Sequence, residues 1–234
     1  MLLTVDINEG GYSENATVIK DIQFTVNSGE LVGLIGPNGA GKSSTIKGIL
    51  GILHKFSGNI EIGDYSYIPE RPIFYENMTL WEHIDFLFST VTGQSQEFFS
   101  RAEELIETFR LKKYTHQYPQ NFSKGTQQKG MIVLALLKQP DLYIIDEPFM
   151  GLDPKATKML LNQLELEKKR GAGILMSTHV LDTAEKICDR FVLIDEGRLI
   201  FEGKLEDIRQ QSGNTNGALL DCFDILTDVK THEK

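Results

Sequence analysis

Residues 36–44 read GPNGAGKSS and begin at the last residue of the apolar run LVGLIG at 31–36. They fit the pattern G-x-x-x-x-G-K-[ST], in which glycines let backbone N–H groups curl around phosphate oxygens without a Cβ clash. Residues 44–53, STIKGILGIL, predict a helix whose N-terminus adds a positive partial charge. This order of strand, loop and helix favours a phosphate-binding loop over a chance glycine-rich turn.

The loop supplies specific groups to a nucleotide. Lys42 can reach the β- and γ-phosphates, and Ser43 can supply an oxygen to Mg²⁺. We expect the remaining loop contacts to come from Gly36, Pro37, Asn38, Gly39, Ala40, Gly41 and Ser44.

Three later apolar runs resemble the one before the loop: LYIID at 142–146, ILMST at 174–178 and FVLID at 191–195. Short runs without alternation suit strands that are buried on both faces of a parallel sheet. Helical patterns lie between these runs, so the sequence predicts an α/β fold with a mainly parallel sheet. The runs LLTVDI at 2–7 and VIKDIQFTV at 18–26 predict N-terminal strands on either side of a turn at 8–15.

Acidic residues and a histidine follow two of the predicted strands. Asp146 and Glu147 come at the carboxyl end of LYIID, which is the sheet edge where open α/β folds bind ligands. Asp146 can hold Mg²⁺, and Glu147 can orient or deprotonate an attacking water. His179 follows ILMST and can hydrogen-bond a γ-phosphate, although a lone histidine there is more often structural. His54, His83, His116 and His232 lack such a context and are expected to be ordinary residues.

The middle of the chain predicts an inserted helical subdomain over about 78–140. Thr79 and Glu82 form a possible capping box. Two apolar stripes at helical spacing follow: Leu80, Ile84, Leu87, Phe88 and Val91, then Phe98, Ala102, Leu105 and Phe109. Farther along, Asp153 and Pro154 predict a helix start, and Gly171 its end. Residues 194–203 predict a hairpin, whereas the polar segment from Gly213 predicts no defined element.

Residues 121–130, NFSKGTQQKG, place polar residues before the apolar stretch MIVLALL at 131–137. Ser123 is a good N-cap, and a helix that is apolar all round should be buried. A buried helix that begins with Ser and Gly can bind an anion, so Ser123 and Gly125 form a second candidate phosphate site. Taken alone, this stretch is better explained as a simple capped helix.

Composition bounds the function. The 234 residues are 41% hydrophobic and carry a net charge of −9, which argues against a general nucleic-acid binder. Cys188 and Cys222 have no metal or CxxC spacing and suit a reducing cytosol. No signal peptide and no apolar run of about 20 residues is evident, so a role at a membrane would need another chain to span it.

These motifs, in this order, resemble the ATP-binding subunits of ABC transporters from about residue 2 to 210. FSKGT at 122–126 holds the place of the family signature, usually LSGGQ, and departs from it at Phe122, Lys124 and Thr126. The resemblance implies a head-to-tail dimer in which Ser123 and Gly125 cap ATP held by the partner's phosphate loop. It also implies that Asp153 faces that interface.

The resemblance gives further residues a role. From the sequence alone, the ring of Tyr12 can stack on a nucleotide base, although a surface turn residue explains it at least as well. The resemblance implies that Tyr12 stacks on adenine and that His179 is a switch. Glu70 in YIPERP stands where the family usually has Gln; it can still reach Mg²⁺ but adds negative charge near phosphates. The alternative is that Glu70 is a solvent-facing loop residue. Together, YIPE, FSKG, DEPFMGLDP and MSTH look most like the bacterial Ecs-type group.

The sequence therefore predicts an ABC ATPase domain at 1–212 and a tail at 213–234. The expected function is hydrolysis of ATP with Mg²⁺ at the cytoplasmic face of the membrane. This hydrolysis is expected to drive a separate membrane-spanning permease, and we expect the transporter to be an exporter. Two complete half-sites favour a homodimer. The main alternative is a soluble ABC-type ATPase, although the chain lacks the second cassette or long coiled coil of such proteins. A different P-loop class would leave Ser123 unexplained, and the intact catalytic motifs oppose an inactive regulatory module.

Overall fold

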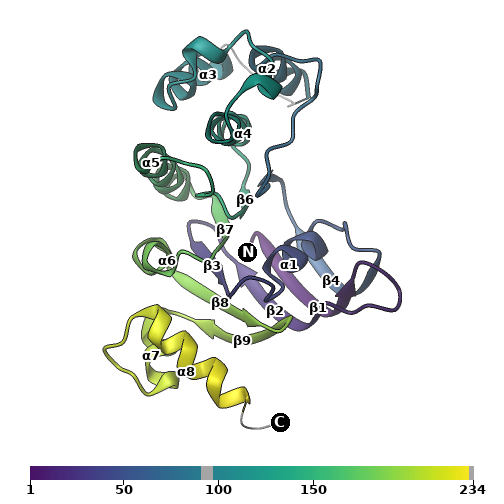
Figure 1. Ribbon diagram of the computed structural model, residues 1–234, viewed down its shortest axis with the longest axis vertical. Coiled ribbons are helices and arrows are strands. Elements are labelled where there is room, and N and C mark those ends of the chain that lie inside the picture. The colour runs from purple at the N-terminus through teal and green to yellow at the C-terminus, as the bar shows by residue number, and fades with distance from the viewer. Residues whose placement is uncertain (91–96, 232–234) are drawn as a thin grey trace.

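The computed structural model describes residues 1–90 and 97–231, with side chains to residue 227. Val91 and His232 lie outside these residues. A nine-stranded sheet has the order β4-β1-β2-β9-β8-β3-β7-β6-β5 and runs through the middle of the molecule (Figure 1). The strands are β1 (Leu3–Gly11), β2 (Ile19–Val26), β3 (Leu31–Ile35), β4 (Lys55–Ile62), β5 (Tyr65–Ile68), β6 (Leu142–Asp146), β7 (Gly173–Thr178), β8 (Arg190–Asp195) and β9 (Arg198–Gly203).

The predicted parallel core is confirmed. Strands β5, β6, β7, β3 and β8 pair in parallel, and every residue of β3, β6 and β7 is buried. Burial on both faces explains why these strands read as unbroken apolar runs. The predicted hairpin is also present, since β9 returns antiparallel to β8.

The N-terminal strands form the antiparallel part of the same sheet, where β1 pairs with both β2 and β4. The predicted turn at 8–15 is too long, because β1 continues to Gly11. Glu9 and Gly10 pair with strands on both sides, and these ladder hydrogen bonds outweigh the turn tendency of the glycines. Strand β4 was not predicted.

Helices cover the sheet and project beyond it at both ends of the molecule. They are α1 (Lys42–Ile49), α2 (Leu80–Thr90), α3 (Glu97–Thr108), α4 (Lys124–Lys138), α5 (Pro154–Arg170), α6 (Leu181–Ile187), α7 (Leu205–Ser212) and α8 (Leu219–Thr231), with short 3₁₀ turns at Lys112–Tyr114 and Pro119–Asn121. Helix α1 begins at Lys42 and stops four residues short of the predicted end. Gly51 has a φ of 69°, a left-handed conformation that ends a helix.

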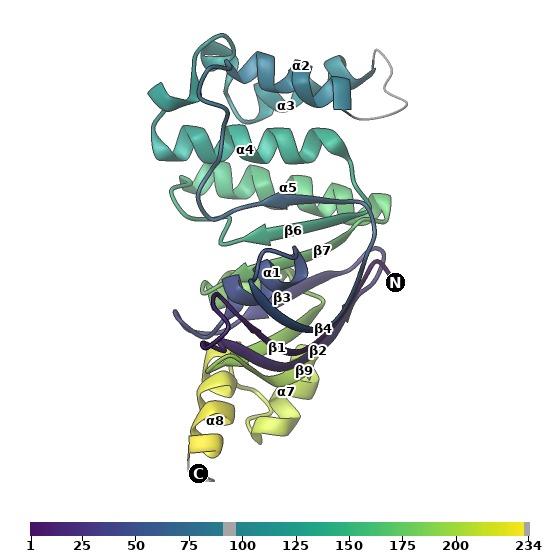
Figure 2. The same ribbon diagram turned by 90° about the vertical axis from the view of Figure 1, so that its right-hand side faces the viewer.

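The helical insert stands at one end of the molecule. Helices α2 and α3 are farthest from the sheet and α4 lies beneath them, as the two perpendicular views show (Figure 2). The predicted capping box is present: the Thr79 N–H donates to the Glu82 carboxylate at 2.6 Å, and the Glu82 N–H donates to the Thr79 hydroxyl at 3.3 Å.

Helices α7 and α8 lie at the opposite end (Figure 1). Their buried residues, including Ile208, Leu219 and Cys222, pack with Phe191 and Leu193 of β8. The segment from Gly213 therefore has a defined element that the sequence did not reveal. Both cysteines are free thiols. Within residues 1–90 and 97–231, no helix combines the length and the apolar character needed to cross a bilayer.

Candidate functional site

The loop between β3 and α1 is shaped for a close backbone approach. A Cβ on Gly36 would lie 2.2 Å from the carbonyl oxygen of Ile194, and Gly41 has a φ of 105°. Only glycine tolerates both situations without strain. The first N–H groups of α1 have no partner within the helix, as at any helix start, so they are available to an anion.

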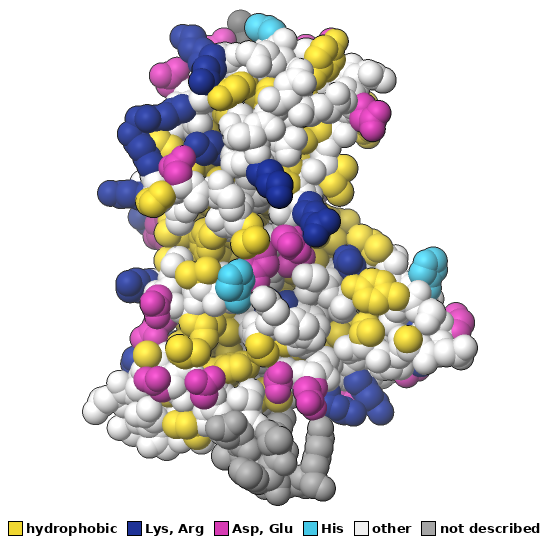
Figure 3. Space-filling model, viewed as in Figure 1, with side chains coloured by type: hydrophobic (Ala, Val, Ile, Leu, Met, Phe, Trp, Pro, Cys, Tyr) yellow, Lys and Arg dark blue, Asp and Glu magenta, His cyan; other side chains and the backbone are white. Residues whose placement is uncertain are grey.

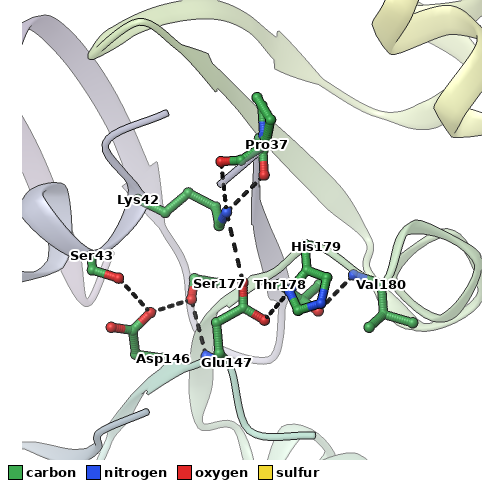
Figure 4. Close-up of polar contacts among 10 residues, drawn as sticks. Pro37, Lys42, Ser43, Asp146, Glu147, Ser177, Thr178, His179 and Val180 are labelled. Atoms are coloured by element: carbon green, nitrogen blue, oxygen red, sulfur yellow. Dashed lines mark hydrogen bonds and ion pairs between the residues drawn. The ribbon is translucent and has the colours of Figure 1, made fainter. Parts of the chain in front are cut away.

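Lys42 is 6% exposed, and its ammonium group is turned back onto the loop. It donates to the carbonyl oxygens of Gly36 at 2.7 Å and Pro37 at 3.1 Å. The same nitrogen lies 3.7 Å from a carboxylate oxygen of Glu147 (Figure 4). These three contacts hold the buried Lys42 ammonium at the mouth of the loop.

The two carboxylates at the end of β6 face different partners (Figure 4). Asp146 is 3% exposed and accepts hydrogen bonds from the hydroxyls of Ser43 at 3.3 Å and Ser177 at 2.5 Å. Glu147 is turned toward Lys42 and His179, and its Oε2 lies 2.9 Å from the His179 Nδ1. Asp146 is thus joined to the start of α1, whereas Glu147 faces the histidine.

Glu147 has a strained backbone. Its φ is 50°, in the left-handed region that residues with a Cβ rarely occupy. The buried hydroxyl and carbonyl of Ser177 hold this conformation, because the Glu147 N–H points to both, at 3.1 and 3.2 Å. Strain of this kind often marks a functional site. Ser177 was missed in the sequence, where its only signal was a hydroxyl inside a buried strand.

A cleft of about 530 Å³ is lined by part of this set and by neighbouring side chains: Lys42, Ser43, Glu147 and His179, together with Asn38, Ser44, Glu70 and Met150. Acidic side chains and a histidine gather at the middle of this face of the molecule (Figure 3). Glu70 is exposed and stands on the cleft wall. Nearby, burial raises the pKa of Tyr67 to about 12, and the charges of Asp146 and Glu70 add to the effect.

Tyr12 lies beside the start of α1. Its hydroxyl is 3.1 Å from the Ser44 hydroxyl, and the ammonium of Lys47 lies 5.0 Å from the ring centroid. The ring is not deeply buried, since Tyr12 is 45% exposed. A surface aromatic is therefore held next to the phosphate loop.

Ser123, Gly125 and Asp153 do not line the cleft of their own chain. As predicted, Ser123 caps α4, and its hydroxyl accepts from the Thr126 N–H at 3.3 Å. A Cβ on Gly125 would lie 2.4 Å from the carbonyl oxygen of Gly151. The segment around Ser123 and the loop before α5 are therefore packed directly together.

Asp153 joins the same two segments. It caps α5 by accepting from the Ala156 N–H at 2.8 Å, which confirms the predicted helix start. Its other carboxylate oxygen lies 3.0 Å from the Lys129 ammonium of α4. Lys129 and Gly151 were missed, because neither has a sequence signal without knowledge of this contact.

His83 is a buried residue of the helical insert. His83 is 6% exposed; one ring nitrogen is 2.9 Å from the Tyr75 N–H nitrogen and the other is 2.8 Å from the Thr79 carbonyl oxygen. It is a structural residue of the helical insert, in accordance with the prediction.

A protein-family model described as ABC transporter matches residues 19–150, which is more than half of the chain. The chain belongs to the ABC transporter ATPase family. It is 53% identical over 225 residues to the ABC transporter ATP-binding protein YthP of Bacillus subtilis, and this alignment covers 95% of each chain. It is 43% identical over 240 residues to EcsA of the same organism, covering 97% of this chain and 96% of EcsA. The predicted Ecs-type likeness is thereby supported.

Other relatives and solved structures agree. The linearmycin resistance ATP-binding protein LnrL of B. subtilis is 31% identical, covering 84% of this chain and 68% of LnrL. A solved ATP-binding subunit of an ABC transporter is 42% identical and superimposes with a TM-score of 0.92, covering 97% of this chain and all of that one. A dimeric ATP-binding cassette with ADP and Pi has a TM-score of 0.76 at 21% identity and shows the shared fold. The predicted ABC ATPase fold and ATPase class are confirmed.

Proposed function

We propose that this ABC ATPase hydrolyses MgATP at the described cleft and drives a separate membrane-spanning exporter from the cytoplasmic face of the membrane. The contacts of Glu147 with Lys42 and His179 carry the proposal. They place a carboxylate, a buried cation and an imidazole around one cleft beside a phosphate loop. That set supplies a base for water, a partner for the terminal phosphates and a further hydrogen-bonding group.

The cleft residues fit a nucleotide and its cation. The left-handed Gly41 leads into the first N–H groups of α1, which lack partners within the helix and can bind phosphate. The hydroxyl of Ser43 stands next to the Asp146 carboxylate, and these two oxygen ligands suit Mg²⁺. Glu70 is a third candidate oxygen ligand on the cleft wall. When bound, Mg²⁺ would neutralise charge on the phosphate oxygens.

The roles follow from these positions. Lys42 and the loop of residues 36–44 would hold the phosphates, and Tyr12 would stack on the adenine. Glu147 would orient or deprotonate the attacking water, while His179 would hold Glu147 and contact the γ-phosphate. Ser43 and Asp146 would hold the cation.

A second copy would complete the site. Ser123 and Gly125 stand at the start of a 15-residue helix but outside the cleft of their own chain. In a head-to-tail homodimer, this helix start would cap the nucleotide of the partner, with Asp153 at the interface. Lys124, exposed beside Ser123, would add positive charge there.

The proposal of a protein partner rests on an apolar groove at the helical insert. Ile73, Tyr75 and Phe86 are 72, 59 and 45% exposed and line a groove of about 370 Å³ with Met131 and Leu134. Exposed apolar side chains gathered in one groove mark an interaction site. We assign it to the membrane-spanning subunit. Export is supported by the Ecs-type likeness and by the resistance function in the name of LnrL.

The decisive experiment measures the solution mass of Glu147→Gln by light scattering, with and without MgATP. We expect an ATP-dependent dimer, because binding remains while hydrolysis stops. Adding Ser123→Arg should abolish this dimer. Adding Asn162→Arg, at an exposed position of α5, should leave it intact and serves as the matched control. A monomer in every condition, or a dimer that persists with Ser123→Arg, would contradict the proposed arrangement.

A further inference from the structure

Tyr12 is fixed mainly by α1. The loop after β1 is closed at its base by hydrogen bonds from the Val18 N–H to the Gly10 carbonyl at 2.8 Å and from the Ala16 N–H to the Ser13 carbonyl at 3.1 Å. These bonds bypass the Tyr12 side chain. Among the residues that the structure describes, the side chain of Tyr12 contacts the polar groups of Ser44 and Lys47, both in α1.

Lys47 contacts Tyr12 in two ways. Its ammonium donates to the phenolic oxygen at 3.3 Å and lies 5.0 Å from the ring centroid. The first contact is a hydrogen bond, and the second distance is within the range of about 6 Å for attraction between a cation and an aromatic ring. Lys47 lies four residues after Ser43, on the turn of α1 that follows the phosphate loop.

Within residues 1–90 and 97–227, Tyr12 is the side-chain partner of the Lys47 ammonium. Among the residues that the structure describes, no carboxylate forms an ion pair with it. Lys55, which supports the same loop from β4, is different: it pairs with Glu9 at 3.0 Å and donates to the Thr17 hydroxyl at 2.9 Å. Lys47 therefore contacts the Tyr12 ring, whereas Lys55 contacts Glu9 and Thr17 and not the ring.

We propose that Lys47 is a positioning residue for the nucleobase, which acts by holding the Tyr12 ring at the edge of the phosphate loop. The inference rests on the proposed stacking of Tyr12 on adenine. A ring anchored from the helix keeps a fixed place relative to Lys42 and Ser43, so base and phosphates are recognised as one rigid unit. Preorganisation of this kind strengthens binding by reducing the ordering that the ligand must impose.

The test compares ATP with inorganic tripolyphosphate, which has the phosphates but no base. Affinities are measured by calorimetry for the wild type, Lys47→Met, Tyr12→Leu, the double variant and the control Lys55→Met. We expect Lys47→Met to weaken ATP binding about threefold to tenfold, as one cation–π contact with one hydrogen bond implies. Tripolyphosphate binding should change less than about twofold. The double variant should bind ATP no more weakly than Tyr12→Leu, and Lys55→Met should match the wild type.

Other outcomes have distinct meanings. Equal weakening of ATP and tripolyphosphate by Lys47→Met would overturn the proposal, because Lys47 would then act on the phosphates as a charge. Additive effects in the double variant would overturn it as well. If Tyr12→Leu weakens ATP binding but Lys47→Met does not, only the positioning role fails. If Tyr12→Leu leaves the ratio of the two affinities unchanged, the stacking role of Tyr12 in the proposed function fails.

Discussion

The Nδ1 of His179 lies 2.9 Å from the Oε2 of Glu147, although the two residues directly follow different strands. Neighbouring parallel strands β6 and β7 bring both to one sheet edge. The histidine is 43% exposed, whereas the carboxylate is 11% exposed. A largely buried carboxylate is thus held by an imidazole at the surface of the cleft.

Glu147→Gln should lower the rate of ATP hydrolysis about 10²- to 10⁴-fold, because a positioned base contributes that much. ATP affinity should stay within a few-fold of the wild type, since Lys42 and the loop remain. Phosphate release and calorimetric titration with ATP would measure the two effects. The control is Glu104→Gln, at an exposed site on α3, which should change neither. Unchanged hydrolysis in Glu147→Gln would rule out Glu147 as the base.

Glu70→Gln should keep ATP binding and change its dependence on Mg²⁺. Removing a negative charge from the cleft wall should tighten metal-free ATP binding about twofold to tenfold, the range for partly screened charges. If Glu70 also reaches the cation, the free Mg²⁺ needed for half-maximal hydrolysis should rise. Titrations of ATP in EDTA and of Mg²⁺ at saturating ATP measure these opposite changes. A solvent-facing Glu70 would alter neither.

Asp153 should stabilise the protein in a pH-dependent way. The hydrogen bond from the Ala156 N–H, and then Lys129, holds the pKa of Asp153 below its ordinary value near 3.8. A carboxyl with a lowered folded-state pKa contributes stability above its ordinary pKa and loses it as pH falls through the folded value. Asp153→Ala should therefore lower Tm at pH 7, and the difference from the wild type should shrink below about pH 4.

Asp153→Asn is the matched variant, because Asn keeps the cap but lacks the charge. Its Tm at pH 7 should fall between those of the wild type and Asp153→Ala. Thermal melts followed by circular dichroism from pH 3 to 7 measure the series. A difference that stays constant over this range would show that the charge of Asp153 does not contribute.

The sequence predicts the parallel core because strands buried on both faces become unbroken apolar runs, as β6 does. Strand β4 was missed, since most of its residues are exposed and it contains Gly58. Helix α8 was missed for a related reason: it buries Cys222 but exposes Leu220 and Ile225, which blurs its periodicity. Elements with few buried residues leave a weak pattern.

The site follows the same logic. The phosphate loop and the ends of β6 and β7 were predicted because their residue types and flanking strands are local signals. The contact of Gly125 with Gly151 and the ion pair of Lys129 with Asp153 join segments about 25 residues apart. Such pairs depend on how α4 and α5 pack, which no local pattern encodes.

Glu167 should contribute strongly to folding. It is 3% exposed and joins Arg101 of the helical insert, at 2.5 Å, to Arg170 of its own helix, at 2.7 Å. Glu167→Gln leaves two partly exposed guanidinium groups without their carboxylate, so the loss should lie between the about 1 kcal/mol of an exposed pair and the about 3–5 kcal/mol of a fully buried one. Urea denaturation measures the loss. Glu165→Gln, which breaks exposed pairs at 3.5 Å on the same helix, should cost at most about 1 kcal/mol. Equal losses would contradict a special role for Glu167.

The apolar groove at the helical insert should decide membrane association. Phe86→Asp places a charge in the groove where we expect the membrane-spanning subunit to bind, and burying an unpaired charge is unfavourable. In cells that produce the transporter, the share of the chain in the membrane fraction should fall severalfold, while ATP hydrolysis by the purified protein stays unchanged. Leu166→Asp, on α5 and 56% exposed, is the matched control and should remain with the membrane. If both variants fractionate like the wild type, the partner binds elsewhere; if neither wild type nor variants reach the membrane, a soluble ATPase becomes the better description.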